Sequence, residues 1–278
     1  MIELYHKVCV DASKMVTNSY STSFSLGIRM FAEELREPIY NIYGFVRFAD
    51  EIVDTFHDYD KSTLLQEFRQ DTYRAIERGI SLNPILHSFQ KVVKEYDIGL
   101  DLIDGFLDSM EMDLDRRIFD REMYDRYIFG SAEVVGLMCL KVFVNGDAEE
   151  YERLKVPAMK LGSAFQKVNF LRDIKSDYED RGRIYFPNVA YESFTCSDKE
   201  EIEVEIQRDF DEALVGINAL PKGAQLGVYL AYQYFQRLLD RIKKCNADEV
   251  KERRVRVPDA TKFMILGSSA LKYNLKSI

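Results

Sequence analysis

The chain has little of what interrupts helices. Its 278 residues include six prolines and fourteen glycines. Because these residues are the strongest breakers of regular structure, their scarcity argues against a fold of many short strands and tight turns. The longest apolar stretch, VVGLMCLKVFV, contains a lysine. It is also shorter than the about 18 apolar residues that a membrane-spanning helix requires.

Cysteine and histidine are scarce as well. The four cysteines are widely scattered, with neither the spacing of a metal site nor that of a disulfide framework. The N-terminal stretch MIELYHKVCVD is charged and lacks the apolar core of a signal peptide. We therefore expect a cytoplasmic protein. A single Glu-x-x-His motif, from Glu3 to His6, argues against a di-iron bundle, in which such motifs are paired.

Basic residues are fewer than acidic residues. Lys and Arg number 38 against 47 Asp and Glu, which gives a formal charge of −9. This balance argues against nucleic acid as a partner, because binding to phosphate backbones depends on basic surfaces. An anionic ligand would need a local positive patch or a bridging metal ion.

What the chain does have is apolar residues at three- and four-residue spacing, the period of a helix. With 46% hydrophobic residues it can bury a substantial core. We predict one all-α domain over residues 1–278. The expected helices span residues 3–17, 38–57, 61–79, 83–97, 99–117, 121–144, 148–178, 198–218, 222–245 and 258–273.

The first candidate site lies in YGFVRFADEIVD, residues 43–54. On a helix with about 100° per residue, four side chains fall in one narrow stripe. These are Tyr43, Arg47, Asp50 and Asp54. The two aspartates are one turn apart, and apolar residues cover the adjoining arc, so we expect the helix to be central.

A second helix repeats this geometry in GSAFQKVNFLRDIKSDYEDRGRIYFP. Here the polar stripe consists of Gln166, Asn169, Asp173 and Asp177. A lone pair of aspartates on a helix is typical of a solvated face. Two acidic rows facing each other on buried helices would repel each other strongly without a cation. Mg²⁺ fits such rows, because it takes oxygen ligands from a few carboxylates and from substrate phosphates.

Both stretches resemble the motifs of the squalene and phytoene synthase family. The first resembles its Y-x-x-x-R-x-x-D-x-x-x-D motif, with Glu51 standing where many members carry another aspartate. The second resembles the family's second aspartate motif through Gln166, Asn169, Arg172, Asp173 and Asp177. It is followed by a signature at Arg183, Tyr185 and Pro187. The resemblance implies an isoprenoid-synthase-type helical bundle around a central apolar cavity.

Weaker matches extend the resemblance to other segments. Ser21, Ser23 and Phe24 match the family's serine-rich entrance, although a helix cap explains them equally well. A helix of small residues that walls the cavity is matched by Tyr127, Ala132, Val135 and Gly136. Gly27, Ile28 and Gly136 suggest a roomy channel. Arg254 and Lys262 match a basic segment that closes over diphosphate, with a solvated basic tail as the alternative.

The resemblance implies the head-to-head condensation of two prenyl diphosphates through a cyclopropylcarbinyl diphosphate. It assigns catalysis to Tyr43, Arg47, Tyr127 and the four aspartates. It assigns substrate binding to Ser21, Ser23, Phe24, Arg47, Ala132, Val135, Gly136, Gln166, Asn169, Arg172, Arg183, Arg254 and Lys262. It also implies three Mg²⁺ ions on Asp50, Asp54, Asn169, Asp173 and Asp177. We expect two C20 substrates and phytoene as the product.

Other assignments stay open from the sequence. Two C15 substrates would give squalene or dehydrosqualene, and NADPH would be needed only for squalene. A non-catalytic relative that binds protein or lipid is a third reading, although such members usually lose the aspartates. Chain-elongating synthases and terpene cyclases carry other metal motifs. The sequence leaves open a peripheral contact with a membrane surface and the choice between monomer and dimer.

Overall fold

The computed structural model describes residues 1–115, 119–180, 182–187, 189–258 and 265. Within these residues the regular structure is helical and includes no strand, which confirms the all-α prediction. The helices are α1 (Ile2–Tyr20), α2 (Thr22–Ile28), α3 (Glu33–Thr55), α4 (Lys61–Arg78), α5 (Pro84–Glu95), α6 (Leu100–Met112), α7 (Arg121–Ile128), the π-helical segment η1 (Phe129–Glu133), α8 (Val134–Phe143), α9 (Ala148–Glu179), the 3₁₀ turn η2 (Tyr191–Ser193), α10 (Cys196–Ala219), α11 (Lys222–Lys243) and α12 (Ala247–Glu252).

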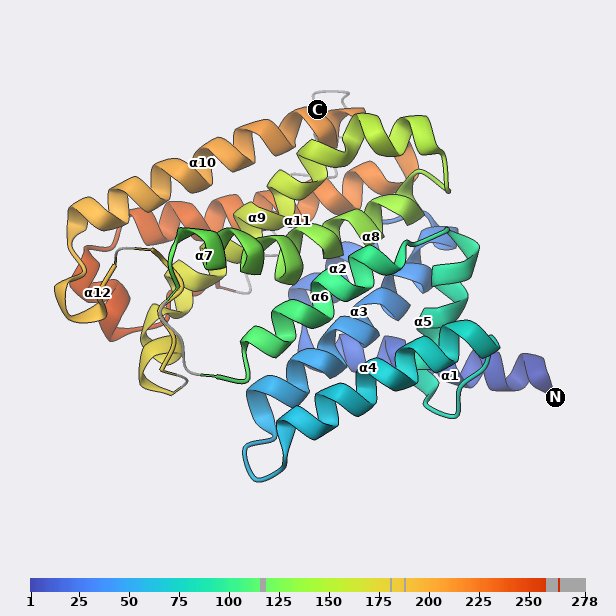
Figure 1. Ribbon diagram of the computed structural model, residues 1–278. Helices are drawn as coiled ribbons and strands as arrows, with labels where there is room; N and C mark the ends of the chain where they lie inside the picture. The colour runs from blue at the N-terminus through green and yellow to red at the C-terminus, as the bar shows by residue number, and fades with distance from the viewer. Residues whose placement is uncertain (116–118, 181, 188, 259–264, 266–278) are drawn as a thin grey trace.

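The helices form two groups that meet around α8 (Figure 1). Helices α1, α3, α4 and α5 pack on one another, at the lower right of the view. Helices α9, α10 and α11 pack together at the top. Helix α8 contacts both α3 and α9 and so joins the two groups. Buried apolar side chains of α3, α4, α5, α8, α9, α10 and α11 belong to one connected core.

Most helix positions agree with the sequence-based expectations. The predicted ranges 3–17, 61–79, 148–178, 198–218 and 222–245 each coincide with one helix, within three residues at either end. Helix α3 begins at Glu33, earlier than expected, because it accommodates Pro38 as its sixth residue. Helices α2 and α12 were not predicted, and the helix predicted over 99–117 ends at Met112. The helix predicted over 258–273 falls almost wholly outside the described residues.

The prediction of one continuous helix over residues 121–144 is wrong. The π-helical segment η1 separates α7 from α8. Such segments hold one extra residue per turn and often occur at functional sites. The apolar periodicity does not reveal this one. Gly130 makes it possible for η1 to lie against α6, because a Cβ at this position would come within 2.3 Å of the Gly105 carbonyl oxygen.

Helix α9 is the central element of the second group. At 32 residues it is about 48 Å long. The side chain of Asp147 caps its first turn by accepting hydrogen bonds from Glu149 N and Glu150 N. On one face, Gly162 lets it approach η1, since a Cβ there would lie 2.6 Å from the Ala132 carbonyl oxygen. This contact fixes how closely α9 can pack on η1.

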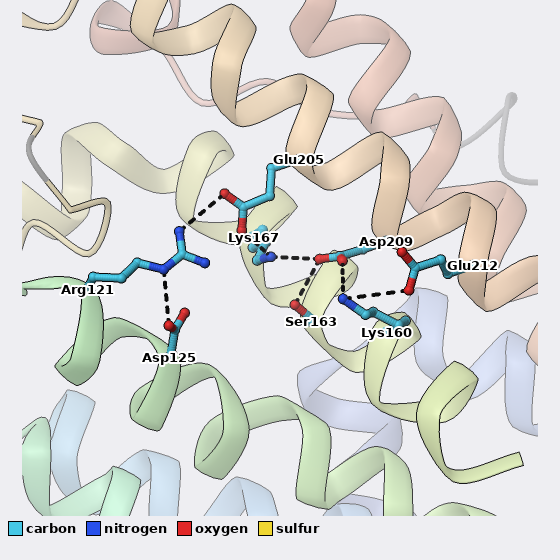
Figure 2. Close-up of polar contacts among 8 residues, drawn as sticks. All are labelled: Arg121, Asp125, Lys160, Ser163, Lys167, Glu205, Asp209 and Glu212. Carbon is cyan, nitrogen blue, oxygen red and sulfur yellow. Dashed lines mark hydrogen bonds and ion pairs between the residues drawn. The ribbon is translucent and has the colours of Figure 1, made fainter.

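A second face of α9 carries a buried polar cluster, which Figure 2 shows. Lys167 Nζ lies 2.6 Å from Asp209 Oδ2 and 2.5 Å from Glu205 Oε1, both on α10. Ser163 Oγ donates to Asp209 over 3.0 Å, and Lys160 Nζ lies 3.0 Å from the other oxygen of the same carboxylate. Burial by itself would raise the pKa of Asp209, but the two lysines outweigh it and lower that pKa.

The cluster lies about a third of a turn around α9 from the Gln166–Asp177 row. Buried ion pairs have strict geometry, because each partner must replace the water that the other has lost. The cluster therefore contributes to the stability of the contact between α9 and α10.

The half-buried carboxyl of Glu133, in η1, provides a test of this electrostatic arrangement. Burial raises its pKa to about 7, against the lowering effects of Lys167 and Lys160. Because the folded state then holds this proton more tightly than the unfolded chain, Glu133 favours folding as pH falls from above 7 toward 4.5. At pH 8 the buried charge costs stability.

We therefore expect Glu133→Gln to raise the melting temperature at pH 8 by about 3 °C, and to change it little at pH 5. Thermal unfolding followed by circular dichroism measures both values. Glu200→Gln, at an exposed position of α10, serves as the control. An equal effect of Glu133→Gln at both pH values would contradict the assignment.

Candidate active site

The predicted site residues line a single cavity of about 690 Å³. Its walls come from α2, α3, η1, α8, α9 and α11. Every predicted residue that the structure describes is part of the lining: Ser21, Ser23, Phe24, Tyr43, Arg47, Asp50, Asp54, Tyr127, Ala132, Val135, Gly136, Gln166, Asn169, Arg172, Asp173, Asp177, Arg183 and Arg254. Lys262 lies outside the described residues. The two acidic rows therefore share one cavity.

Helix α3 supplies the first row. Asp50 and Asp54 lie one turn apart, and Arg47 forms ion pairs with Asp50 and Glu51. The Arg47 guanidinium also lies 4.3 Å from the centre of the Tyr20 ring. Its Nε is buried and has no hydrogen-bond partner among the described residues. This arginine thus neutralises two carboxylates and retains a donor at the edge of the cavity.

Helix α9 supplies the second row. Two arginines hold Asp173: Arg172 Nε donates to its Oδ1 over 2.9 Å, and Arg254 Nε lies 2.7 Å from the same oxygen. Arg254 comes from the segment after α12, so it reaches this row from far along the chain. Asp177 is buried, one turn further along α9. The row therefore has a strong local positive counter-charge.

Arg183 connects the first row to Asp113, another aspartate that lines the cavity. It is buried, and its Nη1 lies 3.2 Å from Asp54 Oδ1 and 3.2 Å from Asp113 Oδ1. Asp113 follows the last residue of α6 and also lines the cavity. Asp113 was not predicted from the sequence, because a single aspartate at the end of an apolar helix belongs to no repeat and no row.

Two tyrosines complete this arrangement. Tyr127 Oη donates to Asp113 Oδ2 over 2.6 Å, and Tyr185 Oη donates to Oδ1 over 3.1 Å. Burial raises the pKa of Asp113 to about 6, while Arg183 and the tyrosine hydroxyls act in the opposite direction. Burial and the adjacent Asp113 carboxylate also raise the pKa of Tyr127 well above its ordinary value. Tyr127 therefore stays protonated as a hydrogen-bond donor.

Away from the charged end, the cavity is aromatic and aliphatic. The rings of Phe31 and Phe143 lie 5.1 Å apart, and Phe165 stacks on Phe235 at 4.0 Å. All four rings line the cavity. Gly136 is also in the lining, but the Ala158 carbonyl oxygen lies 3.0 Å from where its Cβ would be. It brings α8 and α9 together rather than widening the channel, which corrects our interpretation of that glycine.

Ser21 has both roles that the sequence left open. Its hydroxyl caps α2 by accepting a hydrogen bond of 3.1 Å from Phe24 N. It also lines the cavity, as do Ser23 and Phe24. The Phe24 ring packs against the Tyr43 ring with 5.3 Å between centres. The cap therefore positions the entrance residues against α3.

No three Asp, Glu, His or Cys side chains lie close enough to form a metal site within the part of the chain that the structure describes. Arginines lie close to both acidic rows there and supply positive counter-charge. The donors are nonetheless carboxylate and amide oxygens on two walls of one cavity. This set fits Mg²⁺, which typically binds one or two carboxylates and completes its shell with substrate phosphate and water.

Among the described residues, no helix combines the length and the apolar character needed to span a bilayer. Arg254, which pairs with Asp173, has an exposed side chain, at 51% exposure. The other charged groups named above are half-buried or buried.

Comparison with known proteins gives a consistent result. The sequence model described as squalene/phytoene synthase matches residues 17–261. A 4,4'-diapophytoene synthase from Staphylococcus haemolyticus is 26% identical over 83% of this chain and 86% of its own length. A phytoene synthase from Arthrospira platensis is 27% identical over 94% of this chain and 92% of its own length.

The fold has close counterparts among solved structures. A dehydrosqualene synthase in complex with a ligand superposes with a TM-score of 0.84 over 98% of both chains, at 21% identity. A squalene synthase from Alicyclobacillus acidocaldarius gives a TM-score of 0.76 over 87% of this chain and 95% of its own, also at 21% identity. These likenesses confirm the helical bundle of the isoprenoid synthase type.

Proposed function

Because this chain belongs to the squalene/phytoene synthase family, whose members join prenyl diphosphates head to head, we propose that it converts two geranylgeranyl diphosphates to phytoene with the help of Mg²⁺. The observation that supports this proposal is the composition of one cavity. Both aspartate rows and their arginines line the same cavity as the rings of Phe31, Phe143, Phe165 and Phe235.

The residues of the charged end would hold the diphosphates. Arg47 and Arg172 lie beside the first and second rows, where each can donate to phosphate oxygens and stabilise negative charge that develops as diphosphate leaves. Asp50, Asp54, Asn169, Asp173 and Asp177 are the residues that would hold Mg²⁺. When bound, the metal would act as a Lewis acid on the departing diphosphate.

The apolar walls would protect the reaction from water. Loss of diphosphate from an allylic substrate leaves a carbocation, which water would trap. Walls such as Phe165 and Phe235 exclude water and present ring faces that attract positive charge. Tyr43 and Tyr127 would lie where the charged and apolar parts meet, since both line the cavity with buried or half-buried rings.

A C15 substrate is the main alternative, because the relatives include a diapophytoene synthase as well as phytoene synthases. A non-catalytic role is not favoured, since the four aspartates and four arginines converge on one cavity. The proposed product needs no reductant, whereas squalene would require hydride from NADPH.

Product analysis is the direct test. The purified protein is incubated with Mg²⁺ and either farnesyl or geranylgeranyl diphosphate, and the extracted hydrocarbon is identified by chromatography and mass spectrometry. We expect phytoene from the C20 substrate at a kcat/KM at least about 10-fold above that for C15. A preference for C15 would replace the substrate assignment, and no hydrocarbon from either would contradict the function.

The aspartate rows should be indispensable to turnover. We expect Asp50→Ala and Asp173→Ala each to lower kcat/KM by more than about 100-fold, because each removes an oxygen ligand for the metal. The helical circular dichroism spectrum should not change. Asp58→Ala and Asp180→Ala remove exposed aspartates close to each row and serve as controls. Wild-type activity in either row variant would refute the site assignment.

Activity should depend strictly on a divalent cation. Removing metal with EDTA should abolish product formation, and adding excess Mg²⁺ should restore it, because diphosphate leaves poorly without charge neutralisation. A steady-state assay over a range of free Mg²⁺ measures the dependence. Full turnover in EDTA would show that the arginines suffice.

A further inference from the structure

Asp113 forms hydrogen bonds or ion pairs with three neighbouring side chains. It is 4% exposed and sits directly after α6, on the floor of the cavity. A buried carboxylate is costly unless it is paired and hydrogen-bonded. Both oxygens of Asp113 are engaged: Tyr127 binds Oδ2, while Arg183 and Tyr185 bind Oδ1.

The partners of Asp113 come from distant segments of the chain. Tyr127 is in α7, whereas Arg183 and Tyr185 follow α9. Arg183 Nη2 also donates to the Asp113 backbone carbonyl. Asp113 therefore binds Arg183 through both its side chain and its main chain. The segment after α9 has little regular structure, so these contacts are a substantial part of what holds it.

The contacts between Asp113 and Arg183 affect the first aspartate row. The guanidinium lies between Asp113 and Asp54, at 3.2 Å from each. Without the Asp113 charge, Arg183 would lose one of the two anionic partners that it has among the described residues, and would pair more fully with Asp54. That pairing would compete with any cation for the Asp54 carboxylate. Tyr127 would also lose the acceptor that orients its hydroxyl.

We infer that Asp113 is a positioning residue, which holds Arg183 and Tyr127 in place so that Asp54 remains available to bind metal and diphosphate. The expected effect on turnover rests on the proposed function. The positioning of Arg183 and Tyr127 by Asp113 does not depend on it. A different role would be purely structural, in which case loss of Asp113 would affect stability alone.

The chain offers a matched control. Asp209 is another buried aspartate, 0% exposed, and it also lies within a network of cations and a hydroxyl (Figure 2). Unlike Asp113, it is absent from the cavity lining. Asp113→Asn and Asp209→Asn remove the same charge from equally buried places. Both should lower the melting temperature.

The first readout is turnover by the folded enzyme with its preferred substrate. We expect Asp113→Asn to lower kcat/KM by about 10- to 100-fold, and Asp209→Asn to leave kcat/KM within about twofold. The double variant with Tyr127→Phe should lose little more than the worse single variant, since the two residues act as one unit. Equal losses for both asparagine variants, or additive losses in the double variant, would overturn the inference.

The second readout does not require turnover. Calorimetric titration with inorganic pyrophosphate in excess Mg²⁺ should give a dissociation constant at least about fivefold weaker for Asp113→Asn than for Asp209→Asn. If the wild-type protein forms no hydrocarbon, the proposed function fails while this comparison still tests Asp113. Equal pyrophosphate affinities in the two variants would contradict the positioning role.

A milder variant covers the case in which Asp113→Asn does not fold. Tyr185→Phe removes one hydroxyl from Asp113 and can keep the ring stacked on Phe170 at 4.0 Å. We expect it to weaken pyrophosphate binding by about twofold to fivefold in Mg²⁺. An unchanged affinity in this variant would also count against the inference.

Discussion

Concentrated negative charge inside a partly enclosed cavity is the constraint on which this structure depends. Asp50, Asp54, Asp173 and Asp177 all face the same space. Charges of one sign at such density destabilise a fold unless cations are close. In this structure arginines provide the balance, from α3, from α9 and from the segments that follow α9 and α12. Several of the same groups would then meet the diphosphate.

Helix α9 links this charge to the rest of the fold. One face carries the second aspartate row, another holds the buried Lys167–Asp209 pair, and a third packs through Gly162 on η1. The ion pairs contribute to the packing of α9 on α10, and the glycine contact sets its distance from η1. The aspartate row thus lies on a helix that is also packed along two other faces.

The long helices and both aspartate rows could be predicted from the sequence, because each leaves a periodic signal. The 32 residues of α9 show this most clearly, with a polar row running along an otherwise packed helix. Features that leave no periodic pattern in the sequence were not predicted. The π-helical segment η1 adds one residue to a turn and leaves the apolar pattern intact. Asp113 is a lone acid whose partners are 14 and about 70 positions away. The extent of one domain over residues 1–278 remains a prediction.

The most direct test of the account is a crystal structure with Mn²⁺ and an unreactive prenyl thiodiphosphate. The account predicts anomalous density within about 2.2 Å of carboxylate oxygens from both rows, with the diphosphate between them and the prenyl chain along Phe165 and Phe235. Metal bound to one row alone, or a diphosphate held away from both, would contradict it.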